Sequence, residues 1–308
     1  MVDESFGLLF PGQGAQHVGM AGAWCLDCPP ALQIFQDASK VLGYDLLAVC
    51  TNGPSGQLNT TAVSQPALLV TSLAMLEVLR RREDTPFAGD REEFLTAGLS
   101  LGEYSALVHA GALDVQSAVR VVDVRGRAMQ ACADAEPGGM VAILGLDRDQ
   151  IGEVCDTSRG SDVLSIANVL CPGNIVVSGS RSACDRVSDE AMKAGAMKCV
   201  PLEVAGAFHT QLMEPARDRL AEILEEIVVC EPRIPVISNV DAKPHTDPDE
   251  IRSLLARQVC GVVEWHASME HLLSTGVGCL WEVGPGRVLR GLLKRIDRKK
   301  PCNGVIEP

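Results

Sequence analysis

The hydrophobic positions of this chain fall in short runs that end at glycine or proline. Residues 7–10 and 94–97 are mainly apolar runs, and each is followed by a glycine-rich turn. Runs of this length with such ends are typical of buried strands, and we expect further strands at 235–240 and 279–283. Longer stretches with apolar residues at helical spacing, such as 117–129, separate the strands. This alternation predicts an α/β fold.

The segment from residue 133 to 205 has a pattern of its own. Its strand-like and helix-like stretches follow the order β-α-β-β-α-β, which is the ferredoxin-like pattern. The strands are expected at 140–146, 163–168, 175–178 and 199–204, and the helices at 147–155 and 182–194. We therefore expect a ferredoxin-like subdomain at 133–205, inserted into a larger subdomain formed by residues 1–132 and 206–308.

The pentad Gly98-Leu99-Ser100-Leu101-Gly102 is a G-x-S-x-G motif between a predicted strand and a helix-like stretch at 103–108. In this context the motif forms a sharp turn that holds the serine oxygen clear of the sheet, beside a helix N-terminus. Ser100 is therefore a candidate nucleophile, and the larger subdomain is expected to be α/β-hydrolase-like. Taken alone, the motif is also compatible with a plain tight turn.

A serine hydroxyl needs a base within hydrogen-bond reach near neutral pH, and histidine suits this role. Of the 6 histidines, only His209 lies between an apolar run, 200–205, and a helix-like stretch, 212–228. A cleft between the two subdomains would bring His209 face to face with Ser100. The alternative interpretation is a half-buried structural histidine.

A second loop, Phe10-Pro11-Gly12-Gln13-Gly14, follows the first predicted strand. Such a loop can present bare backbone N–H groups to a negatively charged oxygen, although a simple turn has the same composition. Its glycine spacing is not G-x-G-x-x-G, and no Lys-Ser or Lys-Thr pair follows it. We therefore do not expect a nucleotide site here.

Five motifs occur in the same order as in one enzyme family. They are FPGQGAQ near the start, GLSLGEYSAL around Ser100, VRGRAMQ around Arg125, GAFHTQLMEPA around His209 and EVGPGRVL near the end. With them the chain, from about residue 7 to residue 296, resembles the malonyl-CoA:acyl carrier protein transacylases of fatty acid biosynthesis. The resemblance implies that malonyl passes from malonyl-CoA to the phosphopantetheine thiol of acyl carrier protein through a covalent malonyl-serine.

The resemblance also implies roles for particular residues. Ser100 would be the nucleophile and His209 its general base. The backbone N–H groups of Gln13 and Leu101 would form the oxyanion hole. Arg125 would bind the free carboxylate of the malonyl group.

Two further positions match residues with known roles in the family, and two positions depart from its pattern. Gln65 corresponds to a glutamine that lines the substrate pocket, and a backbone carbonyl at Gln258 would orient the histidine. Two positions depart from the family pattern. Leu99 stands where a histidine usually precedes the nucleophile, and Leu170 stands where a second asparagine often follows Asn168.

The residue types themselves support this chemistry. A fixed N–H donor in an oxyanion hole is worth about 3 kcal/mol of transition-state stabilisation. Malonyl carries a carboxylate that acetyl lacks, and the planar guanidinium of Arg125 can bind it through two parallel hydrogen bonds. The alternative for Arg125 is a surface position on a helix. Phe208, next to the histidine, is bulky and favours malonyl over branched methylmalonyl.

Composition fits an enzyme without a membrane anchor. With 308 residues and 46% hydrophobic content, the chain can bury a large core. No apolar run approaches the roughly 20 residues that cross a bilayer, and residues 1–5 lack the signature of a signal or transit peptide. We expect a cytoplasmic enzyme, or one in a plastid or mitochondrial matrix if a presequence has been removed. Because only Cys25 and Cys28 of the 12 cysteines have C-x-x-C spacing, we expect free thiols and no metal.

The formal charge of −13 argues against a nucleic-acid partner. CoA and acyl carrier protein are also anionic, so both would need a local positive surface on this acidic chain. The candidate is a C-terminal basic run: Arg287, Arg290, Lys294, Arg295, Arg298, Lys299 and Lys300. We expect this run, with Lys193 or Lys198, to dock the carrier protein. A solvated charged face is the alternative.

The sequence thus predicts a monomeric acyl-carrier-protein S-malonyltransferase with no permanently bound cofactor. Its substrates would be malonyl-CoA and holo-acyl carrier protein. Three alternatives remain. A serine thioesterase or esterase would use the same serine and histidine but admit water, a polyketide enzyme would load carboxyacyl units in the same way, and a silent partner subunit would catalyse nothing.

Overall fold

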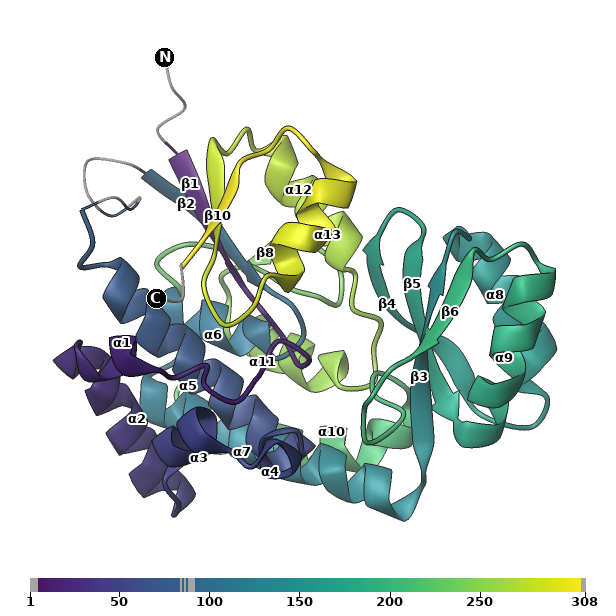
Figure 1. The fold of residues 1–308 in the computed structure, drawn as a ribbon, viewed down its shortest axis with the longest axis horizontal. Coiled ribbons are helices and arrows are strands. Elements are labelled where there is room, and N and C mark those ends of the chain that lie inside the picture. The colour runs from purple at the N-terminus through teal and green to yellow at the C-terminus, as the bar shows by residue number, and fades with distance from the viewer. Residues whose placement is uncertain (1–4, 84, 86, 88–91, 306–308) are drawn as a thin grey trace.

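The computed structural model describes residues 5–305, except 84, 86 and 88–91. Residues 1–4, on which part of the targeting prediction was based, lie outside the described residues. The elements form two bodies that lie side by side in Figure 1, each built on its own β-sheet. The mixed α/β architecture with two subdomains confirms the predicted fold class.

The larger body contains a six-stranded sheet in the order β10-β9-β1-β2-β7-β8. All neighbouring strands are parallel except β7 and β8, which are antiparallel. Because the last residue of β1, Phe10, pairs with the last residue of β2, Gly98, the loops that follow both strands leave the same edge of the sheet. The strands are β1 (Ser5–Phe10), β2 (Glu92–Gly98), β7 (Val236–Ile237), β8 (Pro244–His245), β9 (Cys279–Glu282) and β10 (Cys302–Gly304).

Helices cover both faces of this sheet, so its central strands are apolar on both sides. On β1, Leu8 belongs to the large hydrophobic cluster shared with α2, α5, α6 and α7, whereas Leu9 faces a second cluster with α12 and α13. The helices of this body are α1 (Ala23–Leu26), α2 (Pro29–Leu42), α3 (Leu46–Asn52), α4 (Ser55–Leu58), α5 (Thr61–Leu79), α6 (Gly102–His109), α7 (Val115–Ala135), α10 (Glu214–Glu226), α11 (Pro248–Gln258), α12 (Trp265–Ser274) and α13 (Val288–Ile296), with a short 3-10 turn at Gln211–Met213.

Helix α5 bears on the expectation that no apolar segment is long enough to cross a bilayer. It is 19 residues long and apolar enough to pass for a membrane span, the only such helix among the residues that the structure describes. However, 78% of its most apolar window is buried inside the fold. The helix is apolar all round because it packs between α2, α6 and α7 in the core.

The smaller body is a four-stranded antiparallel sheet in the order β4-β5-β3-β6, with α8 and α9 packed against it. Its elements are β3 (Gly138–Leu144), α8 (Arg148–Arg159), β4 (Leu164–Cys171), β5 (Asn174–Ser180), α9 (Arg181–Lys193) and β6 (Lys198–Pro201). The order β-α-β-β-α-β is as predicted. The capping box of Asp147 and Gln150 fixes the start of α8, where each side chain bonds to the backbone N–H of the other residue.

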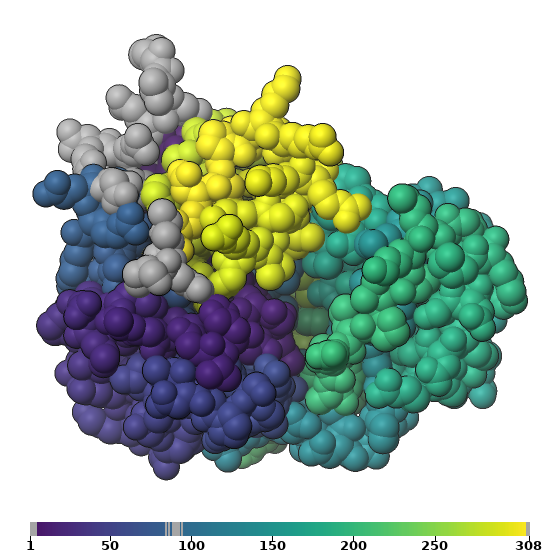
Figure 2. Space-filling view, viewed as in Figure 1, coloured from purple at the N-terminus to yellow at the C-terminus, as the bar shows by residue number. Residues whose placement is uncertain are grey.

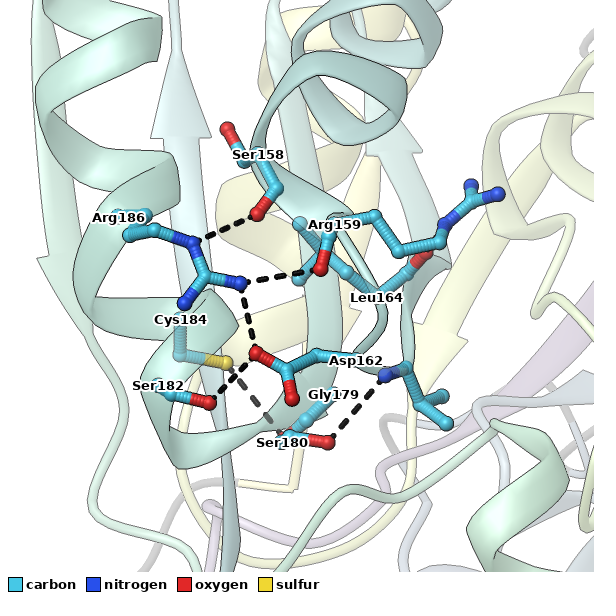
Figure 3. Close-up of polar contacts among 10 residues, drawn as sticks. Ser158, Arg159, Asp162, Leu164, Gly179, Ser180, Ser182, Cys184 and Arg186 are labelled. Atoms are coloured by element: carbon cyan, nitrogen blue, oxygen red, sulfur yellow. Dashed lines mark hydrogen bonds and ion pairs between the residues drawn. The ribbon is translucent and has the colours of Figure 1, made fainter.

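Polar contacts hold the end of α8, the loop after it and the start of α9 together (Figure 3). Arg186 donates to the backbone oxygens of Ser158 and Arg159 and to the carboxylate of Asp162. Ser182 donates to the same carboxylate. This cluster joins the two helices of the smaller body at one end of its sheet.

The contacts that tie the smaller body to the larger one include a backbone pairing and an ion pair. Val263, between α11 and α12, exchanges backbone hydrogen bonds with β4, at 2.8 Å to Ala167 and 3.0 Å to Val169. Arg148 on α8 forms a two-point ion pair with Glu264, at 2.7 and 2.9 Å. The sheet face opposite α8 and α9 is therefore turned toward the larger body.

Several predicted elements are longer than the observed ones. The strand predicted at 235–240 is reduced to β7, because the backbone at Ser238 and Asn239 bonds to Lys243 and Glu103 instead of to a strand. The strand predicted at 199–204 ends at Pro201, which has no N–H for a ladder. The helix predicted at 212–228 begins at Glu214, with a proline in its first turn, and ends at Glu226.

Candidate active site

The G-x-S-x-G motif forms a tight turn between β2 and α6. Ser100 has a φ angle of +49°, which residues other than glycine rarely adopt. A Cβ atom on Gly98 would lie 1.9 Å from the backbone carbon of Gly102, and one on Gly102 would lie 2.1 Å from the backbone oxygen of Phe10. Only glycine fits at these two positions, and the resulting turn presents Ser100 at the carboxyl end of β2.

The loop after β1 packs directly against this turn. The backbone N–H of Leu99 donates to the last carbonyl of β1 at 3.0 Å, and a Cβ on Gly12 would lie 2.4 Å from the carbonyl oxygen of Leu99. Gln13 and Leu101, one on each loop, both line the cavity that contains Ser100. The two predicted oxyanion-hole residues are therefore brought to the same cavity as the serine.

His209 reaches Ser100 from the segment that follows the smaller sheet. Its Nε2 atom lies 2.9 Å from Ser100 Oγ, and its Nδ1 atom lies 2.9 Å from the backbone oxygen of Gln258. Since a carbonyl oxygen only accepts, the proton resides on Nδ1 and Nε2 is the acceptor for the serine proton. The contact with Gln258 has the geometry expected of a carbonyl that orients the histidine.

Burial sets the charge of His209. The residue is 5% exposed. Desolvation, and then the positive charge of Arg125, lower the pKa of the imidazole from 6.5 to about 4. The ring is therefore neutral near pH 7, which is the form that a general base requires.

Arg125 on α7 is a buried cation whose partners are neutral. It is 1% exposed, and its guanidinium donates to Gln65 Oε1 at 2.7 Å, to Gln258 Oε1 at 3.0 Å and to Ser100 Oγ at 3.1 Å. Its guanidinium carbon lies 5.5 Å from the ring centre of Tyr104. Across the described residues, no carboxylate forms an ion pair with Arg125. Burial lowers the pKa of Arg125, but a guanidinium remains charged at neutral pH.

Two buried residues support the turn, and sequence reasoning did not assign their roles. Asn239 accepts from the backbone N–H of Ser100 at 2.5 Å and donates to the backbone oxygen of Gly98 at 2.8 Å. Glu103 accepts from the backbone N–H of Asn239 at 3.0 Å and from the side chain of Gln258 at 2.7 Å. The available signals were a glutamate directly after the motif and an asparagine ending a predicted strand. Neither signal identifies a partner more than 130 residues away.

A cavity of about 330 Å³ lies between the two bodies and contains these groups. In Figure 2 the surface is hollowed where the yellow C-terminal segment meets the teal smaller body. The polar residues that line the cavity are Gln13, Ser100, Arg125, Asn168, Asn174 and His209, and the apolar ones are Leu99, Leu101, Met129, Met140, Ala142, Leu170, Val176, Leu202, Val204, Phe208, Val288 and Leu292. Gln65 is buried behind Arg125 and does not line this cavity.

Comparisons with known proteins agree with this geometry. The acyl transferase domain family matches residues 8–296. The malonyl CoA-acyl carrier protein transacylases of Escherichia coli K12 and Bacillus subtilis are 41% and 39% identical to the chain, over 98% and 97% of its length and 96% and 93% of theirs. The crystal structure of an acyl carrier protein S-malonyltransferase from Vibrio cholerae superposes with a TM-score of 0.92 at 40% identity, covering 98% of this chain and 97% of that one. This chain belongs to the malonyl-CoA:acyl carrier protein transacylase family.

Membership in the transacylase family confirms the enzyme class predicted from the five motifs. A further relative is a malonyl-transacylase solved in complex with a type II polyketide acyl-carrier protein, with a TM-score of 0.90, 40% identity and coverage of 97% of this chain and 94% of that one. In the present chain, Leu99 and Leu170 line the cavity and pack against an apolar cluster that includes Leu289 and Leu292 of α13. The two departures from the family pattern therefore make this side of the cavity more apolar.

The buried position of His209 generates a prediction about its charge. We expect ring nitrogen NMR signals of a neutral imidazole, protonated at Nδ1, from about pH 5 to pH 8, because the lowered pKa places its titration below this range. The exposed His17 serves as an internal comparison from the same sample. An imidazolium signal from His209 at pH 6 would contradict the geometry described above.

Proposed function

We propose that this protein transfers a malonyl group from malonyl-CoA to the phosphopantetheine thiol of acyl carrier protein, in fatty acid biosynthesis. One observation carries the proposal. The hydroxyl oxygen of Ser100 lies within hydrogen-bond distance of both a neutral imidazole, His209, and a buried guanidinium, Arg125. The first group suits proton transfer, and the second suits an acyl group that ends in a carboxylate.

The reaction proceeds in two steps, acylation of Ser100 and transfer of the acyl group to the carrier thiol. Ser100 Oγ attacks the thioester carbon while His209 Nε2 takes the serine proton, which gives a tetrahedral oxyanion. The oxyanion collapses, the carbon–sulfur bond breaks, and the imidazolium returns the proton to the departing CoA thiol. The carrier thiol then gives its proton to His209, attacks the malonyl-serine ester and releases Ser100 with its proton restored. A thioester is consumed and another is formed, so no further reactant is needed.

The backbone N–H groups of Gln13 and Leu101 stabilise the oxyanion in this proposal. They belong to the two loops that meet at the carboxyl edge of the sheet, and both residues line the cavity beside Ser100. Rigid loops suit this role because the donors are fixed before the charge develops. The close approach of Gly12 to Leu99 supports the required rigidity.

Arg125 selects the acyl group. A buried cation without a carboxylate partner is costly, and the malonyl carboxylate would supply the missing charge. An acetyl group would leave the guanidinium with its neutral partners only. Gln65 contributes by fixing the guanidinium from behind, and Phe208, which lines the cavity, limits the space for a branched acyl group.

Localisation, assembly and partners complete the proposal. The two bodies act as subdomains formed by 1–132 with 206–308 and by 133–205, and α7, which extends to Ala135, links them. We place the enzyme in the cytoplasm as a monomer, with no resident cofactor and no nucleic-acid or membrane partner. The relatives named above are bacterial, which gives the plastid and mitochondrial alternatives no support.

Loading of a polyketide carrier is a second candidate function. It is favoured by the similarity to a malonyl-transacylase that was solved with a type II polyketide acyl-carrier protein. The chemistry at Ser100 would be identical, and only the carrier would differ. Parallel transfer assays with both kinds of holo-carrier distinguish the two candidates.

Three members of the C-terminal basic run also bind groups within the fold. Arg290 pairs with the buried Glu282, Arg295 donates to backbone oxygens at Pro172 and Gly173, and Lys300 donates to the backbone oxygen of Val277. These three residues hold the fold together. The other members, Arg287, Lys294, Arg298 and Lys299, are exposed and remain candidates, together with Lys193 and Lys198. Lys294 lies on α13, Arg287 directly precedes this helix, and Arg298 and Lys299 follow it. Val288 and Leu292 of the same helix line the cavity.

The central step is tested by the covalent intermediate. After brief exposure to malonyl-CoA, we expect mass spectrometry to find malonyl on the peptide that contains Ser100, and to find none in Ser100→Ala. Adding holo-carrier should discharge the adduct rapidly, because the carrier thiol is the second acceptor. Absence of the adduct, or a release rate that does not respond to the carrier, would favour a silent protein or an esterase instead.

Replacing the guanidinium tests selectivity. In Arg125→Ala we expect kcat/KM for malonyl-CoA to fall about 10- to 100-fold, because a charge-assisted hydrogen bond to the acyl carboxylate is lost. The value for acetyl-CoA should stay constant or rise. Arg120→Ala, on the exposed side of the same helix, is the matched control. Equal losses for both substrates would refute the selective role.

Charge reversal tests the docking surface. We expect Lys294→Glu to slow transfer to the acidic carrier about three- to tenfold at low salt, and the difference to shrink at high salt. Lys40→Glu on α2 changes the net charge equally at an exposed site that is not on the basic run, so it should have little effect. If the two variants behave alike, docking involves another surface.

A further inference from the structure

A buried carboxylate lies behind the active site. Glu103, in the first turn of α6, is 3% exposed and does not line the cavity. It therefore does not contact an acyl group in the cavity. Burying a carboxylate is costly unless its surroundings compensate. Its contacts indicate what it contributes to the site.

Among the residues that the structure describes, each hydrogen-bond partner of the Glu103 carboxylate is a donor. Its Oε2 atom accepts from the backbone N–H of Asn239 at 3.0 Å and from Gln258 Nε2 at 2.7 Å, and the hydroxyl of Ser238 also donates to it. An ionised carboxylate is an acceptor only, whereas a protonated one also needs an acceptor for its own proton. The set of neighbours is therefore complementary to the ionised form.

The first contact chain runs through Gln258. Its Nε2 donates to Glu103 and to the backbone oxygen of Ser100, while its Oε1 accepts from Arg125. If the amide were reversed, its oxygen would face the carboxylate and its N–H groups would face the guanidinium. Both contacts would be repulsive, so an ionised Glu103 permits one amide orientation only. In that orientation Arg125 is bound on the side next to Ser100 Oγ.

The second contact chain runs through Asn239. Glu103 binds the backbone N–H of Asn239, and the side chain of Asn239 then bonds to Ser100 and Gly98 on both sides of the strained turn. One carboxylate thus braces both the turn that carries the nucleophile and the amide that holds the arginine.

The charge of Glu103 depends on pH. Burial raises the pKa of Glu103 to about 7, although the three donors and the nearby charge of Arg125 oppose this increase. Among the described residues, Arg125 is the one charged group that acts on Glu103. Glu103 therefore changes charge near neutral pH, whereas His209 stays neutral down to about pH 4.

We propose that ionised Glu103 is a positioning residue for acyl transfer, which fixes the amide of Gln258 and the turn at Asn239 and thereby orients Arg125 and Ser100 toward the acyl thioester. This inference rests on the proposed function. It predicts that neutralising Glu103 misplaces the reacting groups without removing any of them. Misplacement of about 1 Å can cost on the order of 100-fold in rate.

The test measures single-turnover acylation of Ser100 by malonyl-CoA in Glu103→Gln, Glu103→Asp and Glu77→Gln. Glu103→Gln keeps the size but removes the negative charge that holds the Gln258 amide and the N–H of Asn239, so we expect acylation to slow about 10- to 100-fold. Glu103→Asp keeps the charge and should recover part of the rate. Glu77→Gln, on α5, neutralises a carboxylate that is also bound by two side chains, those of Arg80 and Arg81, and should acylate at the wild-type rate.

The pH profile separates positioning from simple loss of stability. In the wild type, the acylation rate should rise with pH through a midpoint near 7. In Glu103→Gln this rising limb of the pH profile should disappear. The malonyl-to-acetyl preference should also fall, because Arg125 is less firmly held. If Glu103→Gln does not fold, the pH profiles of the wild type and of Glu103→Asp still test the role of Glu103, because the acylation rate of both must rise with pH near neutrality.

The results are distinguishable from failure of the proposed function. If wild-type Ser100 takes up no malonyl, the proposed function itself is wrong. If the wild type acylates without a limb near pH 7, or if Glu103→Gln keeps the wild-type rate and profile, only the inference about Glu103 is overturned.

Discussion

Gln258 connects the proposed catalytic groups of this enzyme, and the rest of the site depends on its contacts. Its backbone carbonyl binds His209, its side-chain oxygen binds Arg125, and its side-chain nitrogen binds both the Ser100 carbonyl and Glu103. The residue is fully buried at the end of α11. Because these bonds are buried, His209, Arg125 and Ser100 are held in one arrangement before a substrate arrives.

The two sheets give this arrangement its surroundings. The parallel sheet brings the turn at Ser100 and the loop at Gly12 to one edge, where ligands bind in folds of this kind. The antiparallel sheet turns Met140, Ala142 and Val176 toward that edge and makes the cavity mainly apolar. Exclusion of water matters for a transferase, since the malonyl-serine ester must await a thiol. The contacts of Val263 and of Arg148 with Glu264 keep the two bodies together.

Local patterns allowed much of this to be predicted. The order of strands and helices at 133–205 was readable because each element depends on near neighbours in sequence, as the capping box at Asp147 illustrates. The turn at Ser100 was readable because its two glycines are sterically required. His209 was singled out by its place between an apolar run and a helix-like stretch. The roles of Gln13, Leu101, Arg125 and Gln258 came from a resemblance to a family, since no local rule brings residues so distant in sequence together.

Long-range contacts explain what the sequence did not reveal. Asn239 lies 139 residues from Ser100, and Glu103 lies 155 residues from Gln258, so their pairing depends on the whole fold. The short β7 has the same cause, because the backbone at Asn239 bonds to Glu103 instead of to a strand. Gln65 was expected in the pocket, but the fold places it behind Arg125, where it is a further neutral acceptor for the guanidinium.

A crystal structure of the enzyme trapped as its malonyl-serine tests the central claim most directly. The account predicts continuous density from Ser100 Oγ to a carboxylate bound by the guanidinium of Arg125, with the ester carbonyl oxygen at the N–H groups of Gln13 and Leu101. Gln258 should keep its present contacts with His209 and Glu103. A malonyl carboxylate that points into solvent, or an ester oxygen away from both N–H groups, would contradict the account.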